Sequence, residues 1–190
     1  MSNESAIIKV QTPATNEVDS ESSSHEKWMK IALDHAREAL ENGEVPVGCL
    51  FIYNNEIIAN GGNTVNETKN ATRHAEMICI DTVLNWCKDN QMDYANIFKE
   101  ISVVVTVEPC IMCASALLQL KTKQIIYGCA NNRFGGCSSV FDVCKVYSDC
   151  NTLVISGIFP DEAINLLKEF YKGENPNAPK SKVKKKINEI

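Results

Sequence analysis

The sequence lacks the features that mark membrane proteins, secreted proteins and proteins with nucleotide cofactors. No apolar run approaches the roughly 20 residues that a membrane-spanning helix needs, so we expect no association with a membrane. The first residues, MSNESAIIKV, have no basic segment leading into an apolar one, so we expect no signal peptide and a location in the cytoplasm and nucleus. Glycine-rich phosphate loops of the Walker or dinucleotide type are also missing, so we expect no cofactor of that kind.

An excess of basic residues is missing as well. The 19 Lys and Arg residues are outnumbered by 24 Asp and Glu residues, and the net charge is −5. Residues 1–26 and 27–172 each carry a net charge of −4, whereas residues 173–190 carry +3. This distribution argues against a strongly basic nucleic-acid-binding domain. A nucleic-acid ligand would need positive charge from the C-terminal segment or from a partner protein.

The nine cysteines do not fit a disulfide framework. Their number is odd, and a secreted disulfide scaffold is usually shorter and has an even number. We therefore expect most of them to be free thiols that pack as small hydrophobic side chains. Seven cysteines fall under this expectation: Cys49, Cys79, Cys87, Cys129, Cys137, Cys144 and Cys150.

Composition divides the chain into three segments. Residues 1–24 are Ser-rich and acidic with few large apolar side chains, so we expect them to be disordered. Residues 25–172 have the composition of one globular domain that is large enough to bury a core. Residues 173–190 form a basic tail.

Within the central segment, hydrophobic patterns predict an α/β domain with one mixed sheet and helices packed on it. Helical spacing of apolar residues, with Ser24 as the expected first N-cap, predicts helices at 27–43, 74–88, 110–121 and 160–172. β-rich apolar runs predict strands at 47–53, 57–63, 101–107, 124–129 and 152–157. The second strand should return antiparallel to the first, and the continuous run at 101–107 indicates the central strand.

Two short fragments, RHAEM and PCIMC, suggest a metal site. The second contains Cys110 and Cys113, one helical turn apart near a helix N-terminus, where the helix dipole favours thiolates. Together with the imidazole of His74 they would supply three ligands of a tetrahedral zinc ion and leave the fourth position open, as catalysis requires. Glu76 follows His74 by two residues, so it could lie beside the metal without binding it and move protons.

Other interpretations of these residues stay open at this point. A Cys-x-x-Cys pair by itself can be a redox pair, and His74 by itself can be an ordinary histidine. A zinc ion with four protein ligands would be structural, and the chain would then be a non-catalytic scaffold. Glu76 argues against a scaffold, because structural zinc has no use for a proton shuttle. Glu108, just before PCIMC, is expected to be a structural carboxylate or one that supports a metal ligand.

His-x-Glu followed by Pro-Cys-x-x-Cys resembles the signature of zinc nucleobase deaminases. The resemblance covers about residues 28–172 and implies a three-layer α-β-α sandwich of the cytidine-deaminase type. Three longer blocks resemble the catalytic subunits of eukaryotic tRNA-specific adenosine deaminases: GEVPVGCLFIYNNEIIANGGNTVNETKNATRHAEMICID, VVTVEPCIMCASAL and YGCANNRFGGCSSV. NATR before the histidine is typical of these subunits, whereas bacterial single-chain relatives typically have Asp-Pro-Thr-Ala there.

This resemblance implies hydrolytic conversion of adenosine to inosine at the wobble position of tRNA anticodons, with Zn²⁺ as cofactor. His74, Cys110 and Cys113 would hold the metal, and Glu76 would protonate ring nitrogen 1 and then the departing ammonia. The implied substrate-binding residues are Asn63, Val47 and Ala75. The family also implies a heterodimer with a homologous, catalytically degenerate subunit that brings a basic domain for tRNA.

Further basic residues are candidates for contacts with tRNA. Five lysines in KSKVKKKI suit phosphate contacts, with a solvated tail or a nuclear-localisation patch as alternatives: Lys180, Lys182, Lys184, Lys185 and Lys186. Arg73 and Arg133 could contact phosphate or a partner, or could be solvated or take part in structural ion pairs. A small-molecule cytidine, deoxycytidylate or nucleobase deaminase is the alternative function, and such an enzyme would not need the lysine tail.

Overall fold

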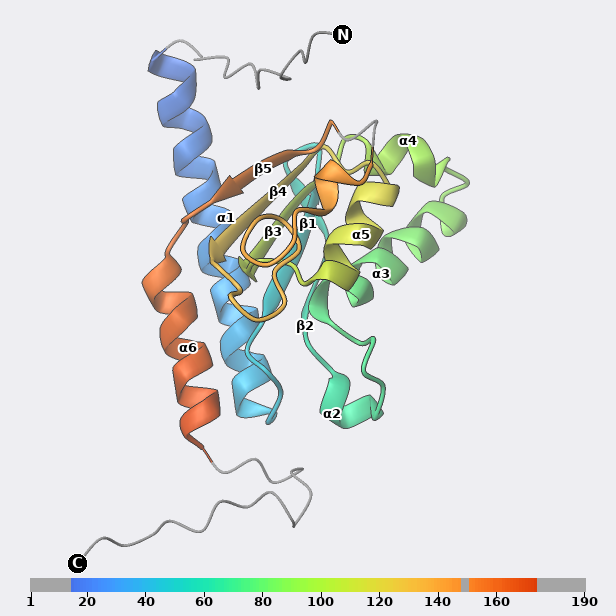
Figure 1. Ribbon diagram of the computed structural model, residues 1–190. Coiled ribbons are helices and arrows are strands. Elements are labelled where there is room, and N and C mark those ends of the chain that lie inside the picture. Colours follow the sequence, from blue (N-terminus) through green and yellow to red (C-terminus); the bar gives the residue numbers. More distant parts are fainter. Residues whose placement is uncertain (1–14, 148–150, 174–190) are drawn as a thin grey trace, which may run out of the picture.

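A five-stranded mixed sheet forms the middle layer of the computed structural model, which describes residues 15–147 and 151–173, with side chains from residue 23 onward (Figure 1). The strands lie in the order β2-β1-β3-β4-β5. Their bounds are Gly48–Tyr53 for β1, Glu56–Gly62 for β2, Ser102–Val107 for β3, Gln124–Cys129 for β4 and Leu153–Ser156 for β5. β1 pairs antiparallel with β2 and β3, whereas β4 pairs parallel with β3 and β5. The predicted mixed sheet with β3 at its centre is confirmed.

Helices cover both faces of this sheet, so the predicted three-layer α-β-α sandwich is confirmed. Helices α1 (Thr15–Glu41) and α6 (Pro160–Lys172) pack on one face. Helices α3 (Ala75–Asp89), α4 (Tyr94–Phe98) and α5 (Ile111–Gln119) pack on the other, as Figure 1 shows. None of the helices that the structure describes is long and apolar enough to cross a membrane.

Alternation of side chains along the strands explains why both faces need a helical cover. In β1, Leu50 and Ile52 point into the core under α1 and α6, whereas Cys49 and Phe51 point into the core under α3 and α5. Successive side chains of a strand point to opposite faces. Since all four of these side chains are apolar, each face of the sheet must be covered by an amphipathic helix.

Close packing of α1 against β1 depends on Gly48. A Cβ atom at this position would overlap the backbone carbonyl of Ala32 in α1 and would lie 2.7 Å from the backbone nitrogen of Ala36. Glycine therefore allows a helix–strand approach that another residue would prevent. The N–H of Gly48 donates to Oγ1 of Thr106 on β3 at 3.1 Å, which ties this end of β1 to the central strand.

Three features differ from the predictions. Helix α1 begins at Thr15, so the predicted N-cap at Ser24 is wrong. In Figure 1 this part of α1 extends past the sheet. Its sequence, TNEVDSESSS, shows no apolar periodicity from which a helix could be predicted. Helices α2 (Val65–Thr68) and α4 lie in segments for which no helix was predicted. The disorder of residues 1–24 stays a prediction, and residues 1–14 lie outside the described residues, as do the five tail lysines.

The cysteines behave largely as predicted. No disulfide joins any two of the eight cysteines in the described part of the chain. Among those without a predicted role in metal binding, Cys144 is partly buried, and the buried ones are Cys49, Cys79, Cys87, Cys129 and Cys137. Cys150 lies outside the described residues.

Candidate active site

The candidate site lies at the edge of the sheet where the parallel strands β3 and β4 end. β1 runs antiparallel to β3, so its beginning lies at the same edge, and β2, antiparallel to β1, ends there. Val47 just before β1, Asn63 just after β2 and Cys110 shortly after β3 are thereby brought together from distant parts of the sequence. In α/β sheets, binding sites form outside the carboxyl ends of parallel strands.

Three side chains converge here in the arrangement of a metal site. His74 is the N-cap of α3 and Cys110 the N-cap of α5, with Cys113 in the first turn of α5. Nδ1 of His74 lies 3.5 Å from Sγ of Cys110 and 3.6 Å from Sγ of Cys113. A tetrahedral zinc ion bound by sulfur and nitrogen holds these atoms about 3.6 Å apart. The three residues therefore fit zinc, and when bound there zinc is a Lewis acid with one open position that acidifies water.

Electrostatics also prepare these residues for a cation. The hydrogen bond with Cys113, together with that with His74, lowers the pKa of Cys110 to about 4. The same contact between the two sulfurs, together with burial, raises the pKa of Cys113 far above its usual value. The pKa of His74 is raised, mainly by its hydrogen bond to Cys110. The contact between the sulfurs thus favours the thiolate at Cys110, and a divalent cation bound here would displace the protons that its ligands still carry.

Glu76 lies in the first turn of α3, two residues after His74, and is almost fully buried at 3% exposure. Burial raises the pKa of its carboxyl to about 7. A group with that pKa is able to take a proton and to give one near neutral pH, which is the property that acid–base catalysis requires. Glu76 is not part of the three-residue metal group, so its carboxylate stays available for protons.

A cavity of about 720 Å³ opens over these residues. Its volume is within the range that small-molecule and cofactor sites occupy. His74, Glu76 and Cys110 line it, as do the predicted substrate-binding residues Val47 and Asn63. The pocket is therefore large enough to bring a nucleobase against the metal group and Glu76.

Asn63 is the polar group best placed to read a base. Its side chain is buried, and its Oδ1 accepts a hydrogen bond of 2.9 Å from the backbone N–H of Ala75. That bond fixes the orientation of the amide and leaves the Nδ2 donor for the pocket. Ala75 is fully buried and does not line the cavity, so a direct substrate contact for Ala75 stays a prediction. What the structure assigns to Ala75 is the support of Asn63.

Glu108 holds the loop that follows β4, in agreement with its predicted structural role. The carboxylate accepts hydrogen bonds from the backbone N–H groups of Asn131, Cys137, Ser138 and Ser139 and from the hydroxyl of Ser139. These bonds outweigh its burial and lower the pKa of the carboxyl.

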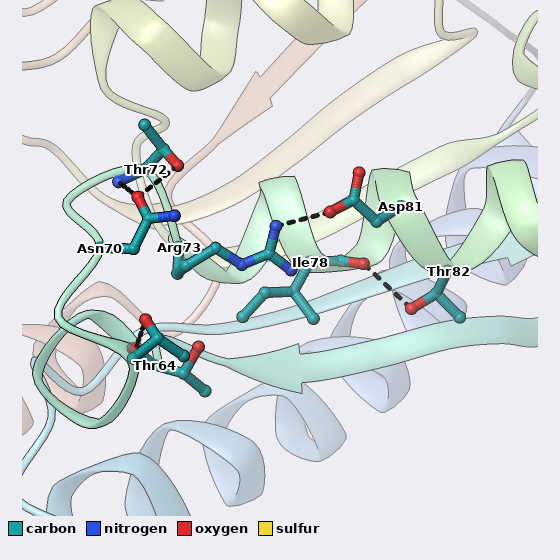
Figure 2. Close-up of polar contacts among 8 residues, drawn as sticks. Thr64, Asn70, Thr72, Arg73, Ile78, Asp81 and Thr82 are labelled. Carbon is teal, nitrogen blue, oxygen red and sulfur yellow. Dashed lines mark hydrogen bonds and ion pairs between the residues drawn. The ribbon is translucent and has the colours of Figure 1, made fainter.

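The arginine candidates have different environments. The guanidinium of Arg73 pairs with Asp81 at 2.5 Å along α3, and Figure 2 shows its side chain lying along the helix. This supports the ion-pair alternative for Arg73. Arg133 lines the pocket, and its guanidinium lies 5.3 Å from the ring centre of the exposed Phe134. Arg133 therefore remains a candidate for substrate contacts.

Sequence reasoning missed several residues that line the pocket. One is Glu44, in the turn between α1 and β1. Another group lies on one face of α6, at the helical spacing that an amphipathic pattern shows, and consists of Ile164, Leu167, Lys168 and Tyr171. The spacing identified α6 as a helix but did not reveal that its C-terminal half borders the pocket. That depends on how α6 packs against the sheet.

Comparisons with known proteins agree with this site. Residues 22–129 match the family described as the cytidine and deoxycytidylate deaminase zinc-binding region. The chain is 56% identical over 161 residues to tRNA-specific adenosine deaminase 2 of Danio rerio, covering 83% of this chain and 75% of the relative. It is 54% identical over 164 residues to the protein of that name from Xenopus tropicalis, covering 85% of this chain and 96% of the relative.

Solved structures show the same architecture. A chain from a study of A-to-I editing by tRNA:A34 deaminases at the wobble position of transfer RNA superposes with a TM-score of 0.65 at 29% identity, covering 73% of this chain and 97% of that one. Guanine deaminase from Nitrosomonas europaea shares the fold, with a TM-score of 0.64 at 17% identity, covering 90% of this chain and all of that one (100%). With its His-Cys-Cys group and buried glutamate, the chain belongs to the cytidine and deoxycytidylate deaminase family of zinc-binding enzymes.

Proposed function

We propose that this protein converts adenosine to inosine at the wobble position of tRNA by zinc-dependent hydrolysis. One observation carries the proposal: the metal group and Glu76 meet at a pocket in a chain more than half identical to proteins named tRNA-specific adenosine deaminase 2. The fold neighbour from the study of tRNA:A34 deaminases supports the same substrate.

The residues of the chain divide the reaction between them. Asn63 directs its Nδ2 donor at the purine and orients the base over the metal group. Glu76 takes a proton from the attacking water and delivers it to ring nitrogen 1. Water adds at carbon 6, and the bond to the exocyclic amine breaks. Glu76 passes the second proton to that amine, so inosine and ammonia leave and Glu76 regains its starting state.

The mouth of the pocket favours a polynucleotide over a free base. Arg133 and Phe134 line it from the loop after β4, and Lys168 and Tyr171 line it from α6. Both aromatic rings are exposed, Phe134 at 57% and Tyr171 at 62%. Cations for phosphates and exposed rings for stacking are the combination that binds single-stranded nucleic acid. An anticodon loop presents such nucleotides on both sides of the wobble base.

A homologous subunit without the catalytic glutamate would complete the enzyme as a heterodimer. Three exposed apolar side chains, Val140, Phe141 and Val146, lie along the segment between β4 and β5 and would suit a protein contact. The partner would also add the positive charge that this acidic chain lacks. The tail lysines would add phosphate contacts. We propose that the complex acts in the cytoplasm and nucleus.

The test is inosine formation at the wobble adenosine of a cognate tRNA by this chain co-expressed with its candidate partner. We expect conversion by the complex and little by the chain alone. Free adenosine, cytidine and deoxycytidylate are assayed beside the tRNA. Turnover of a free compound without turnover of tRNA would identify a small-molecule deaminase instead. If a zinc-loaded complex acted on none of these substrates, the chain would be a non-catalytic scaffold.

A further inference from the structure

Glu44 is a buried carboxylate that the reaction described above does not use. It lies in the turn after α1, with 2% of its surface exposed, and it borders the pocket. Among the residues that the structure describes, no Lys, Arg or His forms an ion pair with it. Its partners are instead two backbone groups of α2. Oε2 accepts from the N–H of Asn66 at 3.0 Å, and Oε1 accepts from the N–H of Glu67 at 2.8 Å.

These bonds replace a cap that α2 does not have. Thr64, at its N-cap position, makes no side-chain hydrogen bond to the first turn. The first N–H groups of a helix have no partners within the helix and need an acceptor from elsewhere. Glu44 supplies that acceptor from a segment 22 residues earlier in the chain. Asn66 returns a bond, because its Nδ2 donates to the carbonyl of Gly43 at 2.9 Å.

Helix α2 is part of a closed loop, residues 64–73, whose two ends meet beside the reacting groups. The N–H of Thr64 donates to the carbonyl of Arg73 at 3.0 Å and closes the neck of the loop. Asn63 stands just before the neck and His74 just after it. The bond from the N–H of Ala75 to Oδ1 of Asn63 lies directly beyond the neck. A displacement of the loop therefore moves the amide of Asn63.

The loop has two anchors of different character. On one side the ion pair of Arg73 with Asp81 ties it to α3, as Figure 2 shows, and both side chains are partly exposed, at 29% and 50%. On the other side Glu44, itself almost fully buried, ties it to the turn after α1 with partly buried hydrogen bonds. Exposed ion pairs contribute little, whereas removal of a carboxylate that is itself buried and bonds two N–H groups leaves those groups without their acceptor. Glu44 is thus the stronger constraint.

We propose that Glu44 is a positioning residue for the deamination. It holds loop 64–73 in place and, through the loop, directs the amide of Asn63 into the pocket. It also sets the wall that Val65, Asn66 and Ala71 contribute to the cavity. The proposal rests on the proposed function, because it concerns how the target base is oriented in that same pocket.

The first experiment compares Glu44→Gln with Asp81→Asn in the complex, using single-turnover and steady-state kinetics on a cognate tRNA. The amide introduced by Glu44→Gln would keep one acceptor but turn an N–H donor toward a backbone N–H, so the loop would shift. We expect kcat to fall about 30-fold with KM changed less than about 3-fold, since misplacing a reacting group by an ångström is worth up to about 100-fold. Asp81→Asn should stay within about 2-fold of the wild type.

A double-mutant cycle with Asn63→Ala separates positioning from a general structural defect. If Glu44 acts through Asn63, adding Glu44→Gln to Asn63→Ala should lower the rate by no more than about 3-fold. If Glu44→Gln lowered the rate as much in the Asn63→Ala background as in the wild type, the proposal would be overturned. A Glu44→Gln enzyme with wild-type kcat would overturn it as well. If Glu44→Gln does not fold, Glu44→Asp replaces it in the same cycle, since it keeps the charge on a shorter side chain.

Two readouts without substrate distinguish failure of this proposal from failure of the proposed function. Zinc content should remain one ion per chain in both single variants, because the ligands are held by α3 and α5. Hydrogen exchange at the amides of Asn66 and Glu67 should be at least about 10-fold faster in Glu44→Gln and unchanged in Asp81→Asn. Unchanged exchange in Glu44→Gln would overturn the positioning role whatever the substrate is. If Glu44→Gln exchanges faster and keeps its zinc, but the wild-type complex does not convert tRNA, the proposed function is wrong. The role of Glu44 in holding loop 64–73 would still stand.

Discussion

Two buried glutamates, Glu76 and Glu108, line the pocket, and their carboxyl pKa values are shifted in opposite directions. Glu76, at the start of α3, is 3% exposed, and its burial raises the pKa of the carboxyl to about 7. Glu108, at the end of β3, is 1% exposed, yet its pKa is lowered, because donors from the loop after β4 outweigh the effect of burial. Burial alone therefore does not decide the charge of a carboxylate. The number of donors that point at it does.

The difference assigns a task to each residue. A carboxyl with few donors is easily protonated and can move protons during a reaction. A carboxylate that accepts several N–H bonds stays charged and serves as the centre around which a loop folds. One region of the site is therefore chemical and the other architectural, although the residue type is the same.

The largest expected effect tests the chemical side. Replacement of Glu76 by glutamine keeps the shape of the side chain and removes the proton shuttle, so we expect the rate on tRNA to fall by about 10³-fold or more. Zinc content should be unchanged, because Glu76 is not a member of the metal group. Rate measurements paired with metal analysis check both statements. A variant that retained a tenth of the wild-type rate would show that another group moves the protons.

The next effect tests the architectural side. Glu108→Gln leaves at least the loop N–H of Asn131 without an acceptor and removes the charge that the other donors face, so we expect the free energy of unfolding to fall by about 2–3 kcal/mol. Urea or thermal unfolding of the zinc-bound protein measures this. Glu76→Gln, with the same chemical change at a carboxylate with few donors, is the matched control and should not destabilise the fold. Equal destabilisation by both variants would remove the distinction between the two residues.

Stability as a function of pH should separate the two residues in metal-free protein. Glu76 has a folded-state pKa of about 7, above its ordinary value of 4.5, so folding takes up a proton between these values. The folded state is therefore stabilised below pH 4.5 relative to higher pH, and about 3 kcal/mol is lost as pH rises to 7. Glu76→Gln should flatten that part of the curve and raise stability at pH 8.

The contribution of Glu108 to stability depends on pH in the opposite direction. Its pKa is lower in the folded state, so its contribution to stability is present above its ordinary pKa and is lost as pH falls through the folded-state value. Glu108→Gln should therefore weaken the loss of stability at acid pH and leave the pH dependence of stability near neutral pH unchanged. Urea titrations between pH 3 and 8 on both variants provide the measurement. If the pH dependence of stability near neutral pH changed in Glu108→Gln and not in Glu76→Gln, the opposite pKa shifts assigned to the two residues would be contradicted.

The smallest effect concerns the glycine that packs against Glu108. A Cβ at Gly135 would lie 2.5 Å from Oε2 of Glu108 and 2.7 Å from the carbonyl oxygen of Asn131. Gly135→Ala should push the loop away from the carboxylate and lower the free energy of unfolding by about 1–2 kcal/mol. In Glu108→Ala, which removes the crowded carboxylate, the added methyl group should be less harmful. If Gly135→Ala lowered stability as much in Glu108→Ala as in the wild type, the added methyl group would be crowded by atoms other than the Glu108 carboxylate.

How far the site was predictable depends on the range of its contacts. His74, Glu76, Cys110 and Cys113 were predicted from two fragments, and the structure brings the three expected metal ligands together. Their spacing places each pair within one turn of a helix, so a local pattern was enough. The structural role of Glu108 was expected, but its partners, 23 to 31 residues further along the chain, were not.

The elements show the same division. The strands and the four long helices were predicted because their apolar residues repeat with the period of the backbone. The first turns of α1 and the short helices α2 and α4 were missed because none of them has an apolar face that repeats. The N–H groups at the start of α2 are satisfied by Glu44, which no local pattern connects to them.

By itself, the sequence predicted the α/β class, the order of the strands and long helices, the three residues of the metal group and the position of Glu76 beside them, because each follows from spacing along one helix or strand. Only the tertiary structure decided that Glu44 caps α2, that Arg73 pairs with Asp81, and that a face of α6 borders the pocket. Those contacts depend on where separate segments meet when the sheet forms. The partner of a side chain is then set by the fold and not by its neighbours in the chain.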